Sequence, residues 1–175
     1  MLIAMAGLPG TGKSSLAGQL ARSLSGVILN KDEMRAALFP PSWIEYSTEQ
    51  DDFCMSIVFQ VASYLLSKNP NQYVILDGCT FSHQYLVLEL DRTAEKFNLP
   101  LKIIECVCAD ETAKQRLERD VRDGRHPAGN RDYELYLAIK DRFEPIREPR
   151  LVVNTDNDFS DCLKLCISYI VGEME

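Results

Sequence analysis

Residues 7–14 read Gly-Leu-Pro-Gly-Thr-Gly-Lys-Ser, and this stretch decides which fold the chain is expected to adopt. It satisfies the pattern G-x-x-x-x-G-K-[ST] and follows a short apolar run at residues 2–6. The segment after it, residues 14–24, carries leucines at helical spacing. Between a strand and a helix, such a stretch turns its backbone N–H groups inward around an anion, and the helix N-terminus adds partial positive charge. The stretch therefore predicts a cradle, or P-loop, for the phosphates of a nucleoside triphosphate.

The cradle supplies the first candidate site residues. Lys13 is placed to reach the β- and γ-phosphates of a nucleotide, and the Ser14 hydroxyl is placed to ligate Mg²⁺. ATP and Mg²⁺ are the expected cofactors, and a glycine-rich turn without a ligand is the alternative. Because the motif occurs in kinases, switches and motors alike, the cradle does not choose among them. The candidate nucleotide-binding residues are Gly7, Gly10, Thr11, Gly12, Lys13, Ser14 and Ser15.

Apolar runs alternate with helical spacings along the rest of the chain. Strands are predicted at residues 2–6, 27–29, 73–77, 101–108 and 151–154. Helices are predicted at residues 14–24, 31–39, 48–68, 82–97, 110–122, 131–143 and 158–171, with Thr48 and Asp110 as helix caps. This order predicts an α/β fold with three layers and a five-stranded, mainly parallel sheet. We expect one domain over residues 1–175, in which 40–47 and 123–130 are loops that face the substrate.

Polar residues follow the second predicted strand, where Asn-Lys-Asp-Glu-Met-Arg occupies residues 30–35. The carboxyl ends of strands in an open parallel sheet line the ligand crevice, so Asp32 is expected to face the transferable phosphate and to accept a proton from an acceptor hydroxyl. Arg35, one helical turn further on, is a candidate for holding an anionic part of the substrate. The equal alternative is a helix N-terminus that uses Asp32 or Glu33 for capping, with Arg35 solvated.

Asp77 closes the apolar run Tyr-Val-Ile-Leu at residues 73–76 and precedes Gly78. An apolar strand that ends in Asp, downstream of a P-loop, is the Walker B pattern, whose carboxylate orders Mg²⁺ directly or through water. Asp77 and Ser14 are therefore the candidate metal ligands, and the alternative is a strand that ends in Asp at an ordinary turn. Thr80, in the loop that follows, is expected to border the acceptor pocket together with Asp77.

Arginines recur every three residues after the fourth predicted strand, at Arg116, Arg119, Arg122 and Arg125. One interpretation is a helical lid over residues 112–130 that closes over ATP and brings guanidinium groups onto its phosphates. We expect Arg119 and Arg122 to be catalytic in this way, with Arg125 as a further candidate. Because acidic residues interleave with these arginines, a solvated helix with salt bridges is the alternative.

Composition excludes several other classes of protein. The 175 residues are 46% hydrophobic and 26% charged, and 19 basic against 26 acidic residues give a net charge of −7. Such an acidic chain is not expected to bind extended nucleic acid, and no apolar run is long enough for a bilayer, so we expect no membrane partner. The first strand begins at Leu2, leaving no room for a signal peptide, and the six cysteines form no C-x-x-C pair. We therefore expect a cytoplasmic protein, monomeric or homodimeric, with reduced and mostly buried thiols.

Four further residues, two histidines and two aromatic residues, have no clear partner in the sequence. His83 and His126 are expected to be surface or loop histidines rather than metal ligands. Trp43 and Tyr46 lie in the proline-containing loop, where they could stack on a ring of the acceptor or anchor the loop. Both interpretations of the aromatic pair stay open.

With these residues assembled, the chain resembles small P-loop kinases of the AAA-type predicted kinase group. This group is similar to the kinase domain of bacteriophage polynucleotide kinase and to adenylyl-sulfate kinase-like and chloramphenicol phosphotransferase-like enzymes. The resemblance rests on residues 7–14, 30–35, 74–78 and 101–125, and in part on 143–155, where Ile146 stands near the usual proline. It implies that Asp32 is the general base, that Arg35 contacts the acceptor side, and that a lid arginine lies between Arg119 and Arg125.

Together the residues and the resemblance predict an ATP-dependent kinase. It is expected to move the γ-phosphoryl group of Mg-ATP to a hydroxyl of a small-molecule acceptor, with Asp32 as general base and Lys13 and the lid arginines stabilising charge. One alternative is a polynucleotide 5′-hydroxyl kinase, since a short strand end needs only one or two phosphate contacts. The other is a nucleotide-dependent ATPase or switch without an acceptor.

Overall fold

Five parallel strands form one sheet in the computed structural model, which describes residues 1–123 and 132–172. The strands are β1 (Leu2–Ala6), β2 (Val27–Asn30), β3 (Val74–Asp77), β4 (Leu101–Val107) and β5 (Leu151–Asn154), in the order β2-β3-β1-β4-β5. The α-helices are α1 (Lys13–Leu24), α2 (Lys31–Leu38), α3 (Thr48–Lys68), α4 (Gln84–Lys96), α5 (Asp110–Asp123), α6 (Tyr133–Asp141) and α7 (Phe159–Val171), and Pro41–Trp43 form a 3₁₀ turn. The predicted α/β fold with a five-stranded parallel sheet is confirmed.

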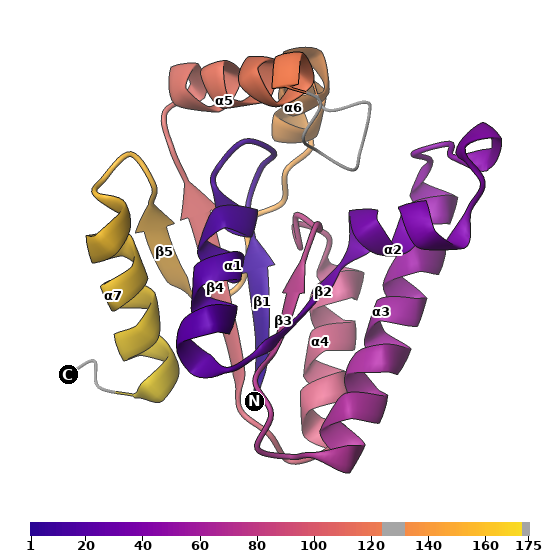
Figure 1. Cartoon of the computed structure of the whole chain (residues 1–175), viewed down its shortest axis with the longest axis vertical. Helices are drawn as coiled ribbons and strands as arrows, with labels where there is room; N and C mark the ends of the chain where they lie inside the picture. Colours follow the sequence, from indigo (N-terminus) through magenta and orange to yellow (C-terminus); the bar gives the residue numbers. More distant parts are fainter. Residues whose placement is uncertain (124–131, 173–175) are drawn as a thin grey trace.

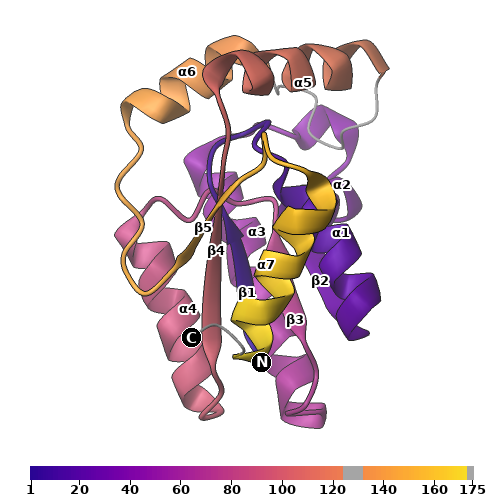
Figure 2. The ribbon, with the colours of Figure 1, turned by 90° about the vertical axis from the view of Figure 1, so that its left-hand side faces the viewer.

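The sheet is covered on both faces, which explains why its strands read as continuous apolar runs. All five residues of β1 are completely buried. Helices α1 and α7 cover one face, and α3 and α4 cover the other (Figures 1 and 2). Even-numbered residues of β1 pack toward α3 and α4, whereas odd-numbered ones pack toward α1 and α7. This alternation is the two-residue period of a strand between two helical layers.

All strand ends that carry polar residues meet at one edge of the sheet, because every strand pair is parallel. The P-loop, the start of α2 and the loop after β3 lie at this edge. Helices α5 and α6 cross above it, away from the two layers that cover the sheet (Figures 1 and 2). The register pairs Asn30 of β2 with Asp77 of β3, so two residues 47 positions apart end neighbouring strands side by side.

Most predicted boundaries agree with the structure to within two residues, but both predicted caps are wrong. The cap of α3 is Ser47 rather than Thr48, and its side chain accepts a hydrogen bond from the Gln50 N–H. At α5, Ala109 occupies the cap position, and its N–H donates to Asp156. The local sequence offered Asp110 as a cap, but tertiary partners draw its carboxylate toward α6 instead.

The predicted lid is only partly visible. Its first part is α5, and α6 is shorter than the predicted helix over residues 131–143. Residues 124–131, with Arg125 and His126, lie outside the described part of the chain.

Within residues 1–123 and 132–172, no helix has both the length and the apolar character needed to cross a membrane.

Gly7 shows how tightly the cradle is built onto the sheet. Its φ is +120°, and a Cβ atom placed on it would lie 2.3 Å from the carbonyl oxygen of Cys106. Its N–H donates to the Thr80 carbonyl oxygen at 3.0 Å. Any side chain at this position would push the start of the cradle away from β4, so glycine is required by space as well as by backbone angle.

Gly7→Ala is therefore expected to lower the free energy of unfolding by roughly 3 kcal/mol, since it combines backbone strain with a clash against backbone atoms. Gly18→Ala is the matched control, because Gly18 lies inside α1 and the nearest atom to an added Cβ, on Arg22, is 3.8 Å away. That variant should gain about 0.5–1 kcal/mol of stability from helix propensity. Chemical denaturation of both variants measures the difference, and equal effects would show that the approach to Cys106 is not limiting.

Candidate active site

A cavity of about 730 Å³ opens at the polar edge of the sheet. One end is lined by the P-loop, by Arg116 of α5 and by Thr155 after β5. The other end is lined by the start of α2, the first turns of α3, the loop after β3 and the first turn of α4. The structure thus brings segments from the whole length of the chain around one space, as expected for a ligand site at the carboxyl edge of an open sheet.

The P-loop forms the floor of the first end. Gly10 and Gly12 have φ values of +76° and +85°, which lets the backbone turn around the space above it. The ammonium group of Lys13 donates to the carbonyl oxygens of Gly7 and Leu8, at 2.8 and 2.6 Å. The Thr11 hydroxyl donates to the Leu8 carbonyl oxygen at 2.7 Å, while Ser14 and Ser15 are exposed at the start of α1 and line the cavity. The predicted cradle residues are therefore assembled in one loop.

Asp77 ends β3 as a buried carboxylate that is only half satisfied. Its Oδ2 accepts from the Asn30 side-chain amide at 2.8 Å. Its Oδ1 is buried and has no hydrogen-bond partner in the described part of the chain. Asp77 is not among the residues that line the cavity, but Gly78, which follows it, and Ser14 are. A buried carboxylate oxygen without a described partner and an exposed serine hydroxyl are oxygen donors of the kind that Mg²⁺ prefers.

Asn30 also caps α2. Its Oδ1 accepts from the backbone N–H groups of Asp32 and Glu33, at 2.8 and 3.2 Å. The cap is Asn30, so neither Asp32 nor Glu33 caps this helix, and the Asp32 side chain is left for other contacts. One amide side chain thus holds the start of α2 and the carboxylate of Asp77 together.

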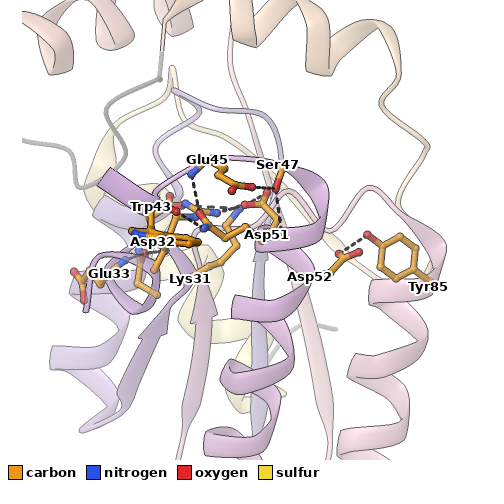
Figure 3. Close-up of polar contacts among 12 residues, drawn as sticks. Lys31, Asp32, Glu33, Trp43, Glu45, Ser47, Asp51, Asp52 and Tyr85 are labelled. Carbon is orange, nitrogen blue, oxygen red and sulfur yellow. Dashed lines mark hydrogen bonds and ion pairs between the residues drawn. The ribbon is translucent and has the colours of Figure 1, made fainter. Parts of the chain in front are cut away.

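Four charged residues form a connected network at the second end of the cavity (Figure 3). Arg35 Nη1 donates to Asp32 Oδ1 at 2.7 Å, and Arg35 Nη2 donates to Asp51 Oδ1. Lys31 Nζ donates to Asp51 Oδ2 at 2.7 Å and lies 3.9 Å from Asp32 Oδ1. We call these four residues, Lys31, Asp32, Arg35 and Asp51, the charge network.

Within the charge network, Arg35 is buried and bound to two carboxylates. This residue is 2% exposed, so the alternative of a solvated Arg35 is wrong. Asp51, which completes the network, was missed by sequence reasoning because it lies on α3, 16 residues away. The only sequence signal for it is a carboxylate in the first turn of a helix, which capping and dipole charge already explain.

The aromatic residues of the proline-containing loop behave differently from each other. The Tyr46 ring lies over the Arg35 guanidinium carbon at 5.1 Å, so Tyr46 anchors the loop to the charge network. Trp43 is 66% exposed, and its carbonyl oxygen accepts from the Gln50 side chain at 2.8 Å.

In the loop after β3, the Thr80 hydroxyl is 3.0 Å from the Ser82 hydroxyl, and both residues line the cavity.

The arginines of α5 separate into three environments. Arg116 donates to the Thr155 hydroxyl and carbonyl oxygen, both at 2.9 Å, and to the Gly10 carbonyl oxygen at 3.4 Å. Arg119 is exposed and lines the cavity. Arg122 pairs with Asp123 at 3.3 Å and is not among the residues that line the cavity. In the sequence the three arginines form one stripe and look equivalent. The contact of Arg116 with the P-loop could not be predicted, because it depends on where Thr155 lies.

Helix α5 is fixed above the cavity by side chains from two other segments. Asp110 accepts from the Tyr136 hydroxyl at 2.7 Å and from Lys140 at 2.5 and 2.6 Å. The hydrogen bonds from Lys140 and Tyr136 hold the pKa of the Asp110 carboxyl below its usual value. The Ala109 N–H lowers the pKa of Asp156 in the same way.

The remaining candidates of the sequence analysis lie at the cavity or in the core. His83 lines the cavity, stacks on Tyr85 and lies 3.6 Å from Glu144. Five of the six cysteines are buried, as expected, and Cys108 is partly exposed. Cys79 lies at the cavity, and burial raises the pKa of its thiol. Among the described residues, no group of three or more His, Cys, Asp or Glu side chains is arranged to hold a metal ion.

Asn30→Ala is expected to lower the free energy of unfolding by roughly 2–4 kcal/mol. It removes a helix cap, worth about 1 kcal/mol, and leaves a second buried oxygen of Asp77 without a donor. Asp158→Ala is the matched control, since Asp158 caps α7 through the N–H groups of Ser160 and Asp161; it should cost only about 1 kcal/mol. Urea titrations compare the two, and similar losses would mean that the contact between Asn30 and Asp77 contributes little.

Comparisons with known proteins agree with this arrangement. A search of curated protein sequences finds no match. Similar solved structures include a Chloroflexus aurantiacus protein for which kinase activity has been suggested, with a TM-score of 0.75, 21% identity and coverage of 96% of this chain and 97% of that one. The Mycobacterium tuberculosis APS kinase in complex with AMPPNP and APS has a TM-score of 0.71, 16% identity and coverage of 97% and 96%. A gluconokinase of Sinorhizobium meliloti has a TM-score of 0.67, 14% identity and coverage of 98% and 91%.

These structural similarities show the fold, a P-loop kinase-like fold, at identities too low to transfer an activity. The family evidence is more direct, because the model of the AAA domain family matches residues 2–146. That match covers the P-loop, the charge network, Asp77 and α5. The chain therefore belongs to the AAA domain family.

Proposed function

We propose that the protein is an ATP-dependent kinase that moves the γ-phosphoryl group of Mg-ATP to a hydroxyl of a small-molecule acceptor. The observation that carries the proposal is that a P-loop and the carboxylate of Asp32 line one cavity. Phosphoryl transfer needs a cradle for the donor and a carboxylate near the acceptor in the same enclosed space. A binding module for nucleotide alone would need only the first of these.

At the nucleotide end, the backbone N–H groups of residues 10–15 and the Lys13 ammonium would bind the phosphates. Lys13 rests on two loop carbonyl oxygens, so its ammonium can exchange those contacts for phosphate oxygens. Ser14 and Asp77 would hold Mg²⁺, and the buried free oxygen of Asp77 supports this assignment. The ion would supply charge neutralisation on the phosphate oxygens when bound.

At the acceptor end, Asp32 would act as the general base. One oxygen of its carboxylate accepts from Arg35, whereas Oδ2 has no hydrogen bond from any residue that the structure describes. In the step, the acceptor hydroxyl gives its proton to Asp32, a bond forms between its oxygen and the γ-phosphorus, and the bond from that phosphorus to the ADP oxygen breaks. The contact with Arg35 fixes the carboxylate for this task.

The arginines of α5 are proposed to have different roles in stabilising negative charge on the phosphates. Arg119 lines the cavity and is proposed to approach the transferred phosphoryl group. Arg122, which pairs with Asp123 near the end of the described helix, remains a second candidate for that role. Arg116 is held against the P-loop and is proposed to order the nucleotide end instead.

A panel of acceptors tests the proposal. Consumption of ATP and formation of a phosphorylated product are measured with sugars and polyols, nucleosides, aminoglycoside-type compounds and 5′-hydroxyl oligonucleotides. Transfer to a small hydroxyl compound supports the proposal, and transfer to oligonucleotides alone would favour the polynucleotide alternative. Steady hydrolysis that no acceptor stimulates would instead favour a nucleotide-dependent ATPase or switch.

Substitutions of Lys13 and Asp32 are expected to affect ATP binding and phosphoryl transfer differently. Lys13→Ala should weaken binding of ATP and abolish transfer, because it removes the cation at the β- and γ-phosphates. Asp32→Asn should leave the affinity for ATP within about threefold and lower kcat by roughly 10²–10⁴-fold, the range for loss of a general base. Calorimetric titration with Mg-ATP and assays of acceptor turnover separate the two effects.

Asp52→Asn is the control for Asp32→Asn, since it removes the same charge from the same cavity at a residue that contacts Tyr85 instead. If Asp32→Asn kept full transfer to an acceptor, Asp32 would not be the base. A thermal unfolding curve for each variant shows that any loss of turnover occurs in folded protein.

A further inference from the structure

Arg35 lies at the acceptor end of the cavity but presents almost none of its surface to it. The residue is 2% exposed, and each terminal nitrogen of its guanidinium group donates to a carboxylate, one of Asp32 and one of Asp51. The third nitrogen, Nε, is buried and has no partner within the described residues. The Tyr46 ring lies over one face of the group. An incoming anion could therefore pair with the terminal nitrogens of Arg35 only by replacing a carboxylate that is already bound.

Asp51 is the group that such an anion would have to replace. Its side chain is 37% exposed, compared with 11% for Asp32, and it lines the cavity from the first turn of α3. One of its oxygens accepts from Arg35 and the other from Lys31. A single carboxylate thus binds both cations of the charge network, as a phosphate or sulfate group could do in its place.

The charge network is electrically balanced, with two cations and two carboxylates. Among the described residues, the other charged side chains that line the cavity, apart from Lys13 and Arg116, are Arg119, Arg142, Asp52 and Asp120, and their charges also sum to zero. Within the described part of the chain, the surplus positive charge of the lining comes from Lys13 and Arg116, next to the P-loop. The described lining therefore has its surplus positive charge at the P-loop and none at the charge network.

We propose that Asp51 is a specificity-determining residue, an internal counter-anion that excludes acceptors with a phosphate or sulfate group near the reacting hydroxyl. The acceptor class that follows is an uncharged or amine-bearing hydroxyl compound. This inference rests on the proposed kinase function for its meaning, but the occupation of Arg35 by Asp51 can be tested without any turnover.

The first test follows the Arg35 side chain directly. The Nε–H signal of Arg35 is recorded by ¹⁵N NMR in protein loaded with Mg²⁺ and a non-hydrolysable ATP analogue, so that the P-loop is filled, while inorganic phosphate is added. In the wild-type protein the signal should not move over the millimolar range. In Asp51→Asn it should move with an affinity for phosphate at least about tenfold higher, the size expected for a gained charge-assisted hydrogen bond.

Two variants serve as controls. Asp52→Asn removes the same charge one residue away, where the carboxylate accepts from Tyr85, and should respond to phosphate as the wild type does. Asp51→Glu keeps the charge and should also not respond. A response of Asp52→Asn equal to that of Asp51→Asn would overturn the proposal, because the effect would then be one of general charge.

The second test compares two acceptors that differ by one phosphate group, a nucleoside and its 3′-phosphate, each with a free 5′-hydroxyl group. The wild type should have the higher kcat/KM for the nucleoside, and Asp51→Asn should shift the ratio toward the 3′-phosphate by about tenfold or more. An unchanged ratio, or a wild-type preference for the 3′-phosphate, would overturn the proposal. If neither compound nor any member of the acceptor panel is phosphorylated, the kinase function fails while the phosphate titration still decides the role of Asp51.

Thermal unfolding shows whether Asp51→Asn is folded, since it leaves the buried Arg35 with one carboxylate. If it is not folded, the wild-type titration alone decides. An Arg35 signal that does not move in phosphate supports the proposal, and one that moves overturns it.

Discussion

The side-chain contact between Asn30 and Asp77 is the constraint on which the rest of the site depends. It joins the ends of β2 and β3, which are paired in register, and the same amide caps α2. Because α2 starts at the sheet edge, Lys31, Asp32 and Arg35 are placed in its first two turns facing α3. Asn30 satisfies one oxygen of Asp77, while the other has no partner among the described residues, so the carboxylate is held in place with one oxygen left for the proposed Mg²⁺. A break in this contact would disturb the charge network and Asp77 together.

The nucleotide end is held by a different set of contacts that reach it from the opposite direction. The Thr155 hydroxyl donates to the Thr11 carbonyl oxygen, and Arg116 donates to Thr155 and to Gly10. These bonds tie the P-loop to the end of β5 and to α5, so the cradle is braced on both sides. The brace uses the backbone carbonyl oxygens of the loop and leaves the N–H groups for an anion. Rigid positioning of this kind is what phosphoryl transfer requires from the protein.

Features that depend on neighbouring residues could be predicted from the sequence, whereas those that depend on distant partners could not. The strands, most helix boundaries and the P-loop follow from local apolar patterns and glycine positions, and they agree with the structure. Asp51 could not be linked to Arg35 because the contact requires the packing of α2 against α3. Asp110 was expected to cap α5, but Tyr136 and Lys140 lie within reach only after α6 has folded over it. The same limit applied to Arg116, which was one of several equivalent arginines until Thr155 was placed.

The charge network both stabilises a buried arginine and fixes the position of the proposed base. A guanidinium group as deeply buried as that of Arg35 needs a carboxylate on each side, because an uncompensated buried charge is strongly destabilising. Without Asp51, Asp32 would be the only carboxylate next to the Arg35 guanidinium group, and its role would be to compensate that buried charge. With Asp51 on the other side, Arg35 holds a single oxygen of Asp32, and the second oxygen has no hydrogen bond from the described residues. The carboxylate that stabilises the contact between α2 and α3 is therefore also the one that leaves the proposed base free to accept a proton.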